Sequence, residues 1–261
     1  MIRKIYELKL LREIRKRPLP RHIAIIMDGN RRFAKSIGLP EYMGHVFGSK
    51  KAERVLEWCL EIGIKTLTMY AFSTENFRRK EEEKRNIFEL VKGELKKLAR
   101  DERTHKYRMR VRVVGRRDLL PPDVLEAVEE VEKATKNYDN HFFNLALAYG
   151  GRQEIVDAIR SILRDVKEGR ISIDDIDENL FSRYLYSDNG YERVDIVIRT
   201  GGELRLSNFL PWQTASSLTY FVDAYWPAFR KIDLLRAIRT WQNIRARYIN
   251  KQEGGITYGQ T

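Results

Sequence analysis

The sequence contains one cysteine, Cys59, among its 261 residues. One cysteine cannot form an internal disulfide or a cysteine-built zinc site, and we interpret Cys59 as a small core residue in a reducing environment. The chain has no apolar run long enough to cross a bilayer, and its first residues do not resemble a signal peptide. We therefore expect a cytoplasmic protein with a globular core.

Two common phosphate-binding motifs are also missing. The stretch from Gly44 to Lys50 superficially resembles a P-loop, but its glycine spacing is one residue short and no predicted strand runs into it. No G-x-G-x-x-G sequence follows the first predicted strand. These absences remove the best support for nucleotide binding.

Positive charge is the property that the chain has in excess, with 49 Lys and Arg residues against 37 Asp and Glu residues and a formal net charge of +12. Such a charge calls for an acidic partner, which could be nucleic acid, anionic lipid or a phosphorylated metabolite. Charge alone does not choose among them, so the choice depends on where the basic residues lie.

Six short apolar segments alternate with helical patterns along the chain. We expect strands at residues 22–27, 64–72, 108–114, 142–149, 194–198 and 218–222, with the third nearer the sheet edge. Helices are expected at about 44–62, 80–103, 121–138, 153–167, 172–186 and 231–248. This alternation predicts an α/β fold in which a single domain has a mostly parallel six-stranded sheet flanked by helices.

The two ends of the chain differ from this central domain, which we assign to residues 22–250. Residues 1–21 have apolar positions at near-helical spacing separated by lysines and arginines, which predicts a basic helix. We favour a helix packed on the domain with a solvated basic face, and the alternative is peripheral contact with a membrane surface. Residues 251–261 contain glycines and no apolar period, which predicts a mobile tail.

The first strand ends abruptly in Asp28-Gly29-Asn30, followed by Arg31 and Arg32 at the start of a helical pattern. Ligands bind at the carboxyl ends of strands in open α/β sheets, and a helix N-terminus with two arginines favours an anion. Asp28 does not favour an anion unless a metal ion is shared between its carboxylate and a phosphorylated ligand. We expect Asn30 to cap the helix. An ordinary turn with two solvated arginines is the alternative.

Polar clusters also follow the second and fifth strands, and parallel strands bring such clusters to one sheet edge. Together the clusters offer three kinds of group. Guanidinium groups for phosphate oxygens come from Arg32, Arg79, Arg199 and Arg205, and hydroxyl donors come from Ser73, Thr74 and Ser207. Carboxylates for a metal come from Asp28, Glu75 and Glu203. This set predicts a site for a polyanion with magnesium. His45, at the start of a helix, could donate to a phosphate or simply face solvent, and the other histidines are interpreted as structural: His22, His105 and His141.

At this point the motifs resemble those of the cis-prenyltransferases, the undecaprenyl and dehydrodolichyl diphosphate synthases. The resemblance covers about residues 18–250 and rests on segments in the same order: His22 to Arg32, Gly44-His45, Tyr70 to Arg79, Tyr149 to Arg152, Asp195 to Gln213, and Trp226-Pro227. It implies a homodimer that uses Mg²⁺ to condense isopentenyl diphosphate onto an allylic diphosphate of farnesyl or geranylgeranyl type, giving a (Z)-polyprenyl diphosphate. It implies no nucleic-acid partner.

The resemblance also implies roles for individual residues. Asp28 would hold the metal at the diphosphates, and Asn76 would assist proton removal. The allylic diphosphate site would be lined by Gly29, Asn30, Arg31, Arg32, Phe33 and His45. Isopentenyl diphosphate would bind at Arg199, Arg205, Leu206 and Ser207. The reacting carbons would be bordered by Ser73, Thr74, Glu75, Phe77 and Arg79. An apolar tunnel would hold the growing chain, with candidate walls at Phe88, Leu90, Val91, Phe142 and Leu145.

Three positions depart from the bacterial pattern of the family. The chain has Glu41 where an arginine would meet the allylic diphosphate, and Leu218 where a glutamate would complete the metal site. Arg31 replaces a glycine. Arg31 and Leu218 resemble the archaeal and eukaryotic branches. Glu41 leaves the choice of allylic substrate open.

Other functions stay open beside chain elongation. A prenyltransferase of the same fold could use a different acceptor, such as an alcohol, although intact Arg199, Arg205 and Ser207 argue against it. A non-catalytic partner subunit is opposed by intact Asp28 and Asn76. A nucleic-acid binder is suggested by charge alone.

Overall fold

A computed structural model of the chain describes residues 2–186 and 193–253. Its sheet has six strands in the order β3-β4-β2-β1-β5-β6, and every pairing between neighbours is parallel. The predicted α/β fold is therefore confirmed, with a sheet that is wholly parallel and β3 at one edge. The strands are β1 (His22–Ile26), β2 (Thr66–Ser73), β3 (Met109–Val114), β4 (His141–Tyr149), β5 (Ile196–Thr200) and β6 (Leu218–Val222).

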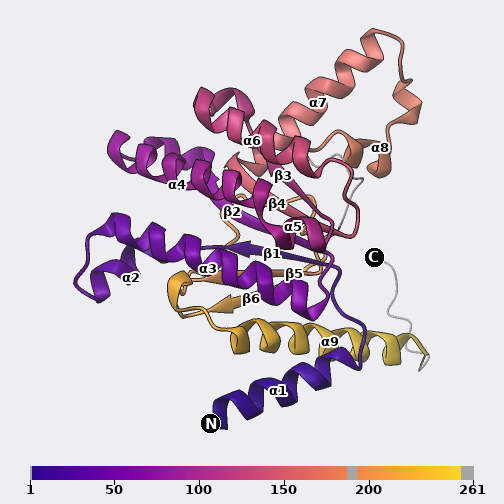
Figure 1. Ribbon diagram of the computed structural model, residues 1–261. Helices are drawn as coiled ribbons and strands as arrows, with labels where there is room; N and C mark the ends of the chain where they lie inside the picture. Colours follow the sequence, from indigo (N-terminus) through magenta and orange to yellow (C-terminus); the bar gives the residue numbers. More distant parts are fainter. Residues whose placement is uncertain (1, 187–192, 254–261) are drawn as a thin grey trace.

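A parallel sheet needs long connections between its strands, and helices supply all of them except that from β5 to β6, which is residues 201–217. The helices are α1 (Ile2–Arg15), α2 (Asn30–Ser36), α3 (Glu41–Ile62), α4 (Glu81–Arg100), α5 (Glu102–Lys106), α6 (Pro122–Thr135), α7 (Gly151–Lys167), α8 (Glu178–Arg183) and α9 (Lys231–Glu253). Figure 1 shows α1 beside α9 beyond β6, whereas α7 and α8 project at the opposite end of the sheet.

Two predicted helices are interrupted. The helix expected over 80–103 breaks at Asp101, whose extended backbone ends α4 and whose side chain accepts from the Arg103 amide at the start of α5. The helix expected over 172–186 is a short 3₁₀ turn capped by Ser172, followed by α8 with Asp177 as its cap. Aspartate and serine side chains that accept hydrogen bonds from backbone amides begin a new helix or turn at these points. The apolar periodicity of the sequence does not reveal such caps.

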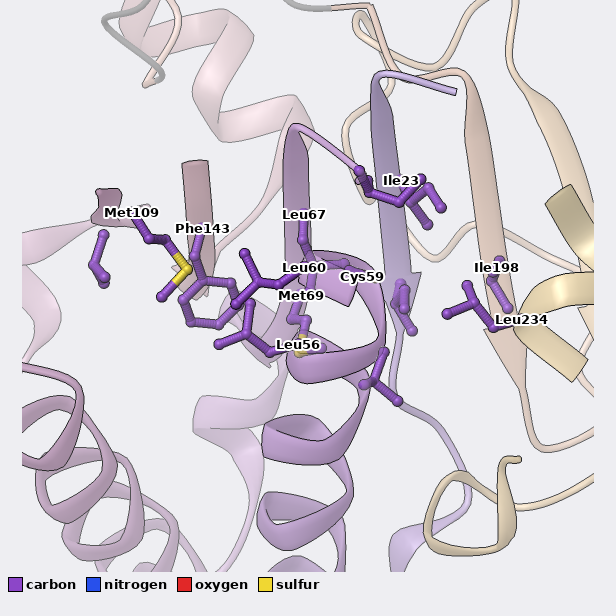
Figure 2. Packing of buried hydrophobic residues seen from close by; sticks show 14 of the residues in the cluster. Ile23, Leu56, Cys59, Leu60, Leu67, Met69, Met109, Phe143, Ile198 and Leu234 are labelled. Atoms are coloured by element: carbon purple, nitrogen blue, oxygen red, sulfur yellow. The ribbon is translucent and has the colours of Figure 1, made fainter. Parts of the chain in front are cut away.

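The larger core lies on one face of the sheet. Alternate residues of the central strands point into it, with Leu67 and Met69 beside Leu56 and Leu60 of α3 and Ile198 beside Leu234 of α9 (Figure 2). Cys59 is a buried free cysteine, as expected, and burial raises the pKa of its thiol to about 12. The opposite face packs intervening strand residues against Tyr149, Phe209 and Leu210. Central strands that are apolar on both faces explain why their sequences read as continuous apolar runs.

The ends of the chain follow the predictions in part. Leu10 and Ile14 of α1 are buried, and α1 packs on α9. Helix α9 continues to Glu253, so residues 251–253 of the predicted tail are helical. Residues 254–261 lie outside the described residues. None of the helices that the structure describes is long and apolar enough to cross a membrane.

Candidate active site

The turn from β1 to α2 places Asp28 at the carboxyl edge of the sheet. The backbone of Gly29 has φ 99°, and a side chain there would collide with the Tyr225 ring at 2.7 Å. Gly29, not Asn30, occupies the N-cap of α2, so the predicted Asn30 cap is wrong. The Asn30 amide instead turns back and donates to the Met27 carbonyl over 3.0 Å. This contact fixes the turn from its inner side.

The Asp28 carboxylate joins two of the predicted clusters. One oxygen accepts from Arg199 over 2.8 Å and the other from Arg32 over 3.1 Å. Partial burial acts to raise the pKa of Asp28, but hydrogen bonds and positive charge from Arg199 and Arg32 outweigh it and hold the pKa below its usual value. Asp28 is therefore ionised at neutral pH and is held between arginines from two different elements.

Arg199, the fourth residue of β5, is 4% exposed and held on several sides. Besides Asp28, it donates to the Ser207 hydroxyl over 2.6 Å and to the Arg205 carbonyl. Its buried Nε atom has no hydrogen-bond partner within the described part of the chain. Ser207 adopts a left-handed backbone, with φ 48°, and two neighbours share it: Asn208 and Leu210. A buried, oriented guanidinium beside a strained loop is typical of a binding site.

Glu203 connects Arg205 with Arg32. Its carboxylate lies 2.6 Å from a guanidinium nitrogen of Arg205 and 3.9 Å from one of Arg32. Gly201 lies under Arg32, and a Cβ atom at Gly201 would come within 2.8 Å of the Arg32 guanidinium. The sequence placed Glu203 among possible metal ligands, whereas in the structure it pairs with arginines.

Glu83 of α4 organises the other side of the site and was not predicted from the sequence. Its carboxylate lies 2.7 Å from Arg79, 3.4 Å from His45 and 3.7 Å from Arg31. Burial, followed by the positive charge of Arg79, lowers the pKa of His45 despite the Glu83 contact, so His45 is neutral at pH 7. The i,i+4 spacing of Arg79 and Glu83 was the signal available in the sequence.

The segment after β2 forms a 3₁₀ turn from Thr74 to Arg78. Ser73 and Asn76 cap this turn reciprocally. The side-chain oxygen of Asn76 accepts from the backbone N–H of Ser73 over 3.1 Å, and the Ser73 hydroxyl accepts from the backbone N–H of Asn76 over 3.2 Å. Glu75 accepts from Thr74 over 3.3 Å and from Asn208 over 3.2 Å. Asn208, which the sequence analysis did not single out, therefore connects this turn to the Ser207 loop.

Three predicted site residues have packing contacts. Phe33 meets Phe47 edge to face, with ring centroids 5.9 Å apart. Phe77 packs at right angles to Phe72, with centroids 5.0 Å apart, and Leu206 packs against the smaller core. Each of these side chains is therefore packed against apolar neighbours.

An apolar cavity leads away from these polar groups, between α3, α4 and the sheet. Its empty space is about 1060 Å³, including the part open to solvent, and Asn30 and His45 line it at the site end. Leu90, Val91 and Leu145 of the predicted tunnel wall also line it. Phe88 and Phe142 do not: Phe88 packs on Phe72, and Phe143 lines the cavity in place of Phe142. Successive residues of a strand face opposite sides, so Phe143 and Leu145, two residues apart, share the cavity face.

Glu41 and Leu218, which depart from the bacterial pattern of the family, both contact neighbouring residues. Glu41 lies 2.7 Å from Lys35 and 3.5 Å from Arg31, and its side chain is 40% exposed. Leu218 is partly buried and packs against the larger core. Among the residues that the structure describes, no group of three or more His, Cys, Asp or Glu is arranged to hold a metal ion. Any metal at Asp28 would therefore take most of its other ligands from substrate oxygens or water.

Convergent arginines above an apolar channel, at the carboxyl edge of a parallel sheet, define a protein that binds phosphorylated apolar molecules. Residues 26–249 match the family model described as "Putative undecaprenyl diphosphate synthase". The chain belongs to this family, the cis-prenyltransferases, and is a prenyltransferase of the kind that elongates cis-prenyl chains.

Individual proteins of known description are similar to this chain over most of their length. The tritrans,polycis-undecaprenyl-diphosphate synthase (geranylgeranyl-diphosphate specific) of Archaeoglobus fulgidus is 61% identical over 92% of this chain and 95% of its own length. The enzyme with the same description from Thermococcus kodakarensis is 54% identical over 93% of this chain and 92% of its own length. A solved structure of lavandulyl diphosphate synthase from Lavandula x intermedia, in complex with dimethylallyl diphosphate, is 33% identical with a TM-score of 0.80, covering 86% of this chain and 95% of the other.

Proposed function

We propose that this protein condenses isopentenyl diphosphate repeatedly onto an allylic diphosphate to give a (Z)-polyprenyl diphosphate. The observation that carries the proposal is the contact of Asp28 with Arg199 and Arg32 beside the mouth of an apolar channel. Two diphosphate groups and one growing hydrocarbon chain need this combination of cations and apolar space.

The arginines divide between two diphosphate sites. Gly29, Asn30, Arg31, Arg32 and His45 surround the start of α2, where backbone amides and positive side chains favour the allylic diphosphate. A second diphosphate, that of isopentenyl diphosphate, would bind at Arg199, Arg205 and Ser207. The Nε atom of Arg199, which has no partner in residues 2–186 and 193–253, supports this assignment, because a buried donor without a partner costs free energy that a ligand oxygen would recover.

Asp28 would hold Mg²⁺ together with diphosphate oxygens. The donor set fits this ion, because Mg²⁺ in phosphate sites takes one or two carboxylates and keeps substrate oxygens and waters as its other ligands. A bound Mg²⁺ would neutralise charge on the departing diphosphate. The arginine partners of Asp28 would then turn their donors to the phosphates.

In the reaction, the allylic carbon–oxygen bond breaks, a carbon–carbon bond forms, and isopentenyl diphosphate loses a proton. Arg32 and Arg199 stabilise negative charge as it develops on the leaving group. Asn76 would assist removal of the proton, and the reciprocal cap with Ser73 holds its amide in one orientation. Ser73, Thr74, Glu75, Phe77 and Arg79 would border the reacting carbons.

Geranylgeranyl diphosphate is the proposed starter. The relatives from Archaeoglobus fulgidus and Thermococcus kodakarensis are described as specific for it, and they share 61% and 54% of aligned residues with this chain. Purified protein, Mg²⁺ and labelled isopentenyl diphosphate should be incubated with dimethylallyl, geranyl, farnesyl and geranylgeranyl diphosphates, and the products sized. Polyprenyl products built best on geranylgeranyl diphosphate are expected. No chain longer than the starter, in every reaction, would contradict the proposal.

Helix α7 supports assembly as a homodimer. Val156, Ile159 and Leu163 follow one another at helical spacing and are 40%, 45% and 60% exposed. Such a stripe on a projecting helix (Figure 1) is the type of surface that a second copy of the chain covers. Light scattering should give a dimer mass for the wild type and a monomer mass for Ile159→Glu/Leu163→Glu, with Ile173→Glu as a matched exposed control.

Helix α1 supports peripheral contact with an anionic membrane surface. Ile5 and Leu8 are 60% and 56% exposed, and Lys4, Lys9 and Arg12 lie exposed around them. Apolar side chains among basic residues favour an interface with acidic lipid. Co-sedimentation with phosphatidylglycerol vesicles should exceed that with phosphatidylcholine vesicles, and Ile5→Ser/Leu8→Ser should reduce it. Equal recovery with both vesicles would contradict this contact.

A further inference from the structure

Two segments that leave different strands meet beside the proposed isopentenyl diphosphate site. The 3₁₀ turn Thr74–Arg78 follows β2, and residues 201–210, which we call the Ser207 loop, follow β5. Strand β1 lies between β2 and β5, so the hydrogen bonding of the sheet does not join β2 directly to β5. The relative position of the two segments therefore depends on contacts made beyond the sheet edge.

Asn208 of the Ser207 loop makes such contacts in two directions. Its side-chain oxygen accepts from the backbone N–H of Arg152 over 2.8 Å, and its side-chain nitrogen donates to Glu75 over 3.2 Å. Its backbone carbonyl accepts from the N–H of Gly151 over 2.9 Å. Asn208 therefore joins the turn after β2 to the first residues of α7.

The residue types around this junction suit the close approach of the three segments. A Cβ atom at Gly150 would lie 2.6 Å from the Thr74 hydroxyl oxygen, and one at Gly151 would lie 2.9 Å from the Asn208 carbonyl oxygen. Asn208 itself has φ 62°, a left-handed conformation that asparagine adopts more readily than most residues. A glycine pair and an asparagine thus allow a contact that bulkier residues would prevent.

The contact between Asn208 and Glu75 involves a charged acceptor. Partial burial acts to raise the pKa of Glu75, but hydrogen bonds from its own backbone and from neighbouring side chains, including Asn208, outweigh it and hold the pKa below its usual value. Glu75 is therefore ionised at neutral pH, and a hydrogen bond to a charged acceptor is stronger than one between neutral groups. Asn208 is neutral, so it holds this carboxylate without adding negative charge beside a diphosphate.

We propose that Asn208 is a positioning residue that holds the turn carrying Asn76 in register with the loop carrying Ser207. This inference rests on the proposed elongation activity, in which Ser207 binds the diphosphate of the acceptor and Asn76 assists the loss of its proton. Few bonds separate that diphosphate from the carbon that loses the proton, so the substrate cannot absorb a shift of one segment against the other. A misplacement of about 1 Å in a reacting geometry can lower the rate roughly 10²-fold.

The decisive variant exchanges the donor for an acceptor. Asn208→Asp keeps the side-chain shape and the oxygen that meets the Arg152 amide, but it sets a second carboxylate against Glu75. We expect kcat to fall about 10-fold, the scale for one charge-assisted hydrogen bond, and the KM for isopentenyl diphosphate to rise several-fold. The KM for geranylgeranyl diphosphate should stay near the wild-type value, because Asn208 is hydrogen-bonded to residues outside the proposed allylic site.

Reversing the pair supplies a rescue that a general loss of structure would not allow. In Asn208→Asp/Glu75→Gln the side-chain nitrogen at residue 75 can donate to the carboxylate at residue 208, so the contact returns with donor and acceptor exchanged. This double variant should recover most of the kcat lost in Asn208→Asp. Asn208→Gly, which tolerates the left-handed backbone but has no side chain, should also lose activity, and adding Glu75→Gln to it should recover none.

The chain supplies a matched control on α9. The side-chain oxygen of Asn243 also accepts a hydrogen bond at the surface, from Arg17 over 2.7 Å. Asn243→Asp should leave kcat and both KM values unchanged. Thermal unfolding of every variant would establish that it is folded.

Two failures of this experiment are distinguishable. Wild-type kinetics in folded Asn208→Asp and Asn208→Gly, or equal recovery by Glu75→Gln in both backgrounds, would overturn the role of Asn208 and leave the elongation activity standing. Wild-type protein that extends no allylic diphosphate would overturn the proposed elongation activity, and the role of Asn208 with it.

Discussion

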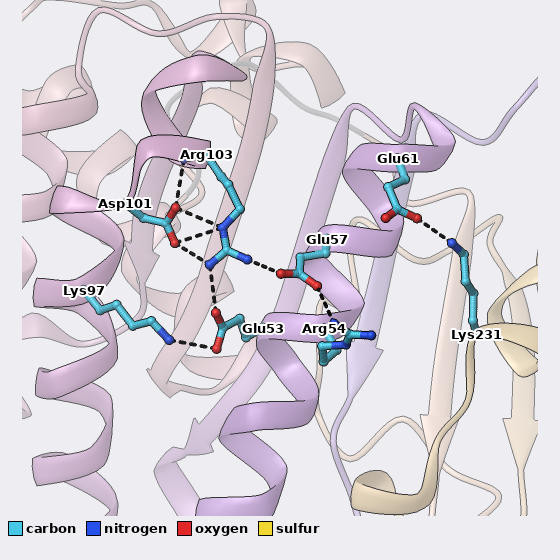
Figure 3. Close-up of polar contacts among 8 residues, drawn as sticks. All are labelled: Glu53, Arg54, Glu57, Glu61, Lys97, Asp101, Arg103 and Lys231. Atoms are coloured by element: carbon cyan, nitrogen blue, oxygen red, sulfur yellow. Dashed lines mark hydrogen bonds and ion pairs between the residues drawn. The ribbon is translucent and has the colours of Figure 1, made fainter.

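Arginines meet carboxylates at the sheet edge and between α3 and α5, but the number of partners per arginine differs. At the sheet edge Asp28 pairs with Arg199 and Arg32, and Glu203 pairs with Arg32 and Arg205. Between α3 and α5 a single guanidinium, that of Arg103, pairs with three carboxylates (Figure 3), two of which also pair with a second cation: Asp101, Glu53 with Lys97, and Glu57 with Arg54.

This difference in the number of partners suits the two places to different tasks. Arginines that share a carboxylate keep unused donors, and a diphosphate can take those donors without leaving a cation unpaired. An arginine paired with three carboxylates has most of its donors occupied, and these carboxylates repel another anion. The sheet edge is therefore suited to bind a polyanion, and the Arg103 contacts are suited to join α3 to α5.

The largest effect is expected from breaking the sheet-edge arrangement at Asp28. Asp28→Ala should lower turnover at least ~10²-fold, the scale for removing one preorganised electrostatic group. Steady-state kinetics with a Mg²⁺ titration would measure it, and circular dichroism would check the fold. Asp123→Ala, which removes a half-exposed carboxylate from the Lys92 pair, is the control. Wild-type turnover with unchanged Mg²⁺ dependence would remove Asp28 from the site.

The next effect separates the two diphosphate sites. Arg199→Ala and Arg205→Ala should raise the KM for isopentenyl diphosphate more than that for the allylic substrate, because each loses a charge-assisted contact worth about 1.5–3 kcal/mol. Arg199→Ala should also lower stability, since Arg199 is 4% exposed and holds Asp28. If the KM of the allylic substrate alone rose, the assignment of the two sites would be reversed.

Removing Arg103 tests the contact between α3 and α5. Arg103→Met takes one cation from Asp101, Glu53 and Glu57 and leaves Lys97 on Glu53 and Arg54 on Glu57, so we expect a loss of about 1–2 kcal/mol in unfolding free energy, between the values for exposed and buried pairs. Urea denaturation at pH 7 measures it. Glu57→Leu/Arg103→Met should recover part of that loss, and a larger loss in the double variant would contradict the account.

The smallest effect concerns Glu41, which pairs with Lys35 and Arg31 at the margin of the sheet-edge site. Glu41→Arg should tighten binding of an allylic diphosphate by about 1 kcal/mol, because it changes local charge by two units in a solvent-screened position. Calorimetric titration of wild type and variant would test this. Weaker binding would indicate that Glu41 has a positive role, such as orienting Arg31.

Much of the fold could be predicted from local pattern. Strands buried on both faces read as short apolar runs, and their alternation with helices predicted a parallel α/β sheet with β3 near the edge. The helix breaks at Asp101 and before Asp177 were missed, because a side chain that caps a backbone amide leaves the apolar period unchanged. Likewise Asn30 was predicted to cap α2, but Gly29 does so in a left-handed conformation.

The candidate site, like the fold, could be predicted from the sequence only in part. Asp28, Arg199 and Ser207 could be predicted to meet because parallel strand ends share an edge, and the structure brings them within hydrogen-bonding distance. Glu83 and Asn208 could not be ranked, because their importance lies in partners from other elements. The channel wall was predicted with Phe142 where Phe143 lies, since a strand's register decides which alternate residues face α3 and α4.

The sequence by itself determined the class of fold, the residue types of the site and the family, because apolar period and motif order are properties of neighbouring residues. Only the tertiary structure decided which carboxylate meets which arginine. It also brought Glu53 and Glu57 of α3 against Arg103 of α5 in the wall of the apolar cavity. These pairings join residues far apart in the chain, and their energies depend on distance, burial and the number of partners, which helix packing sets.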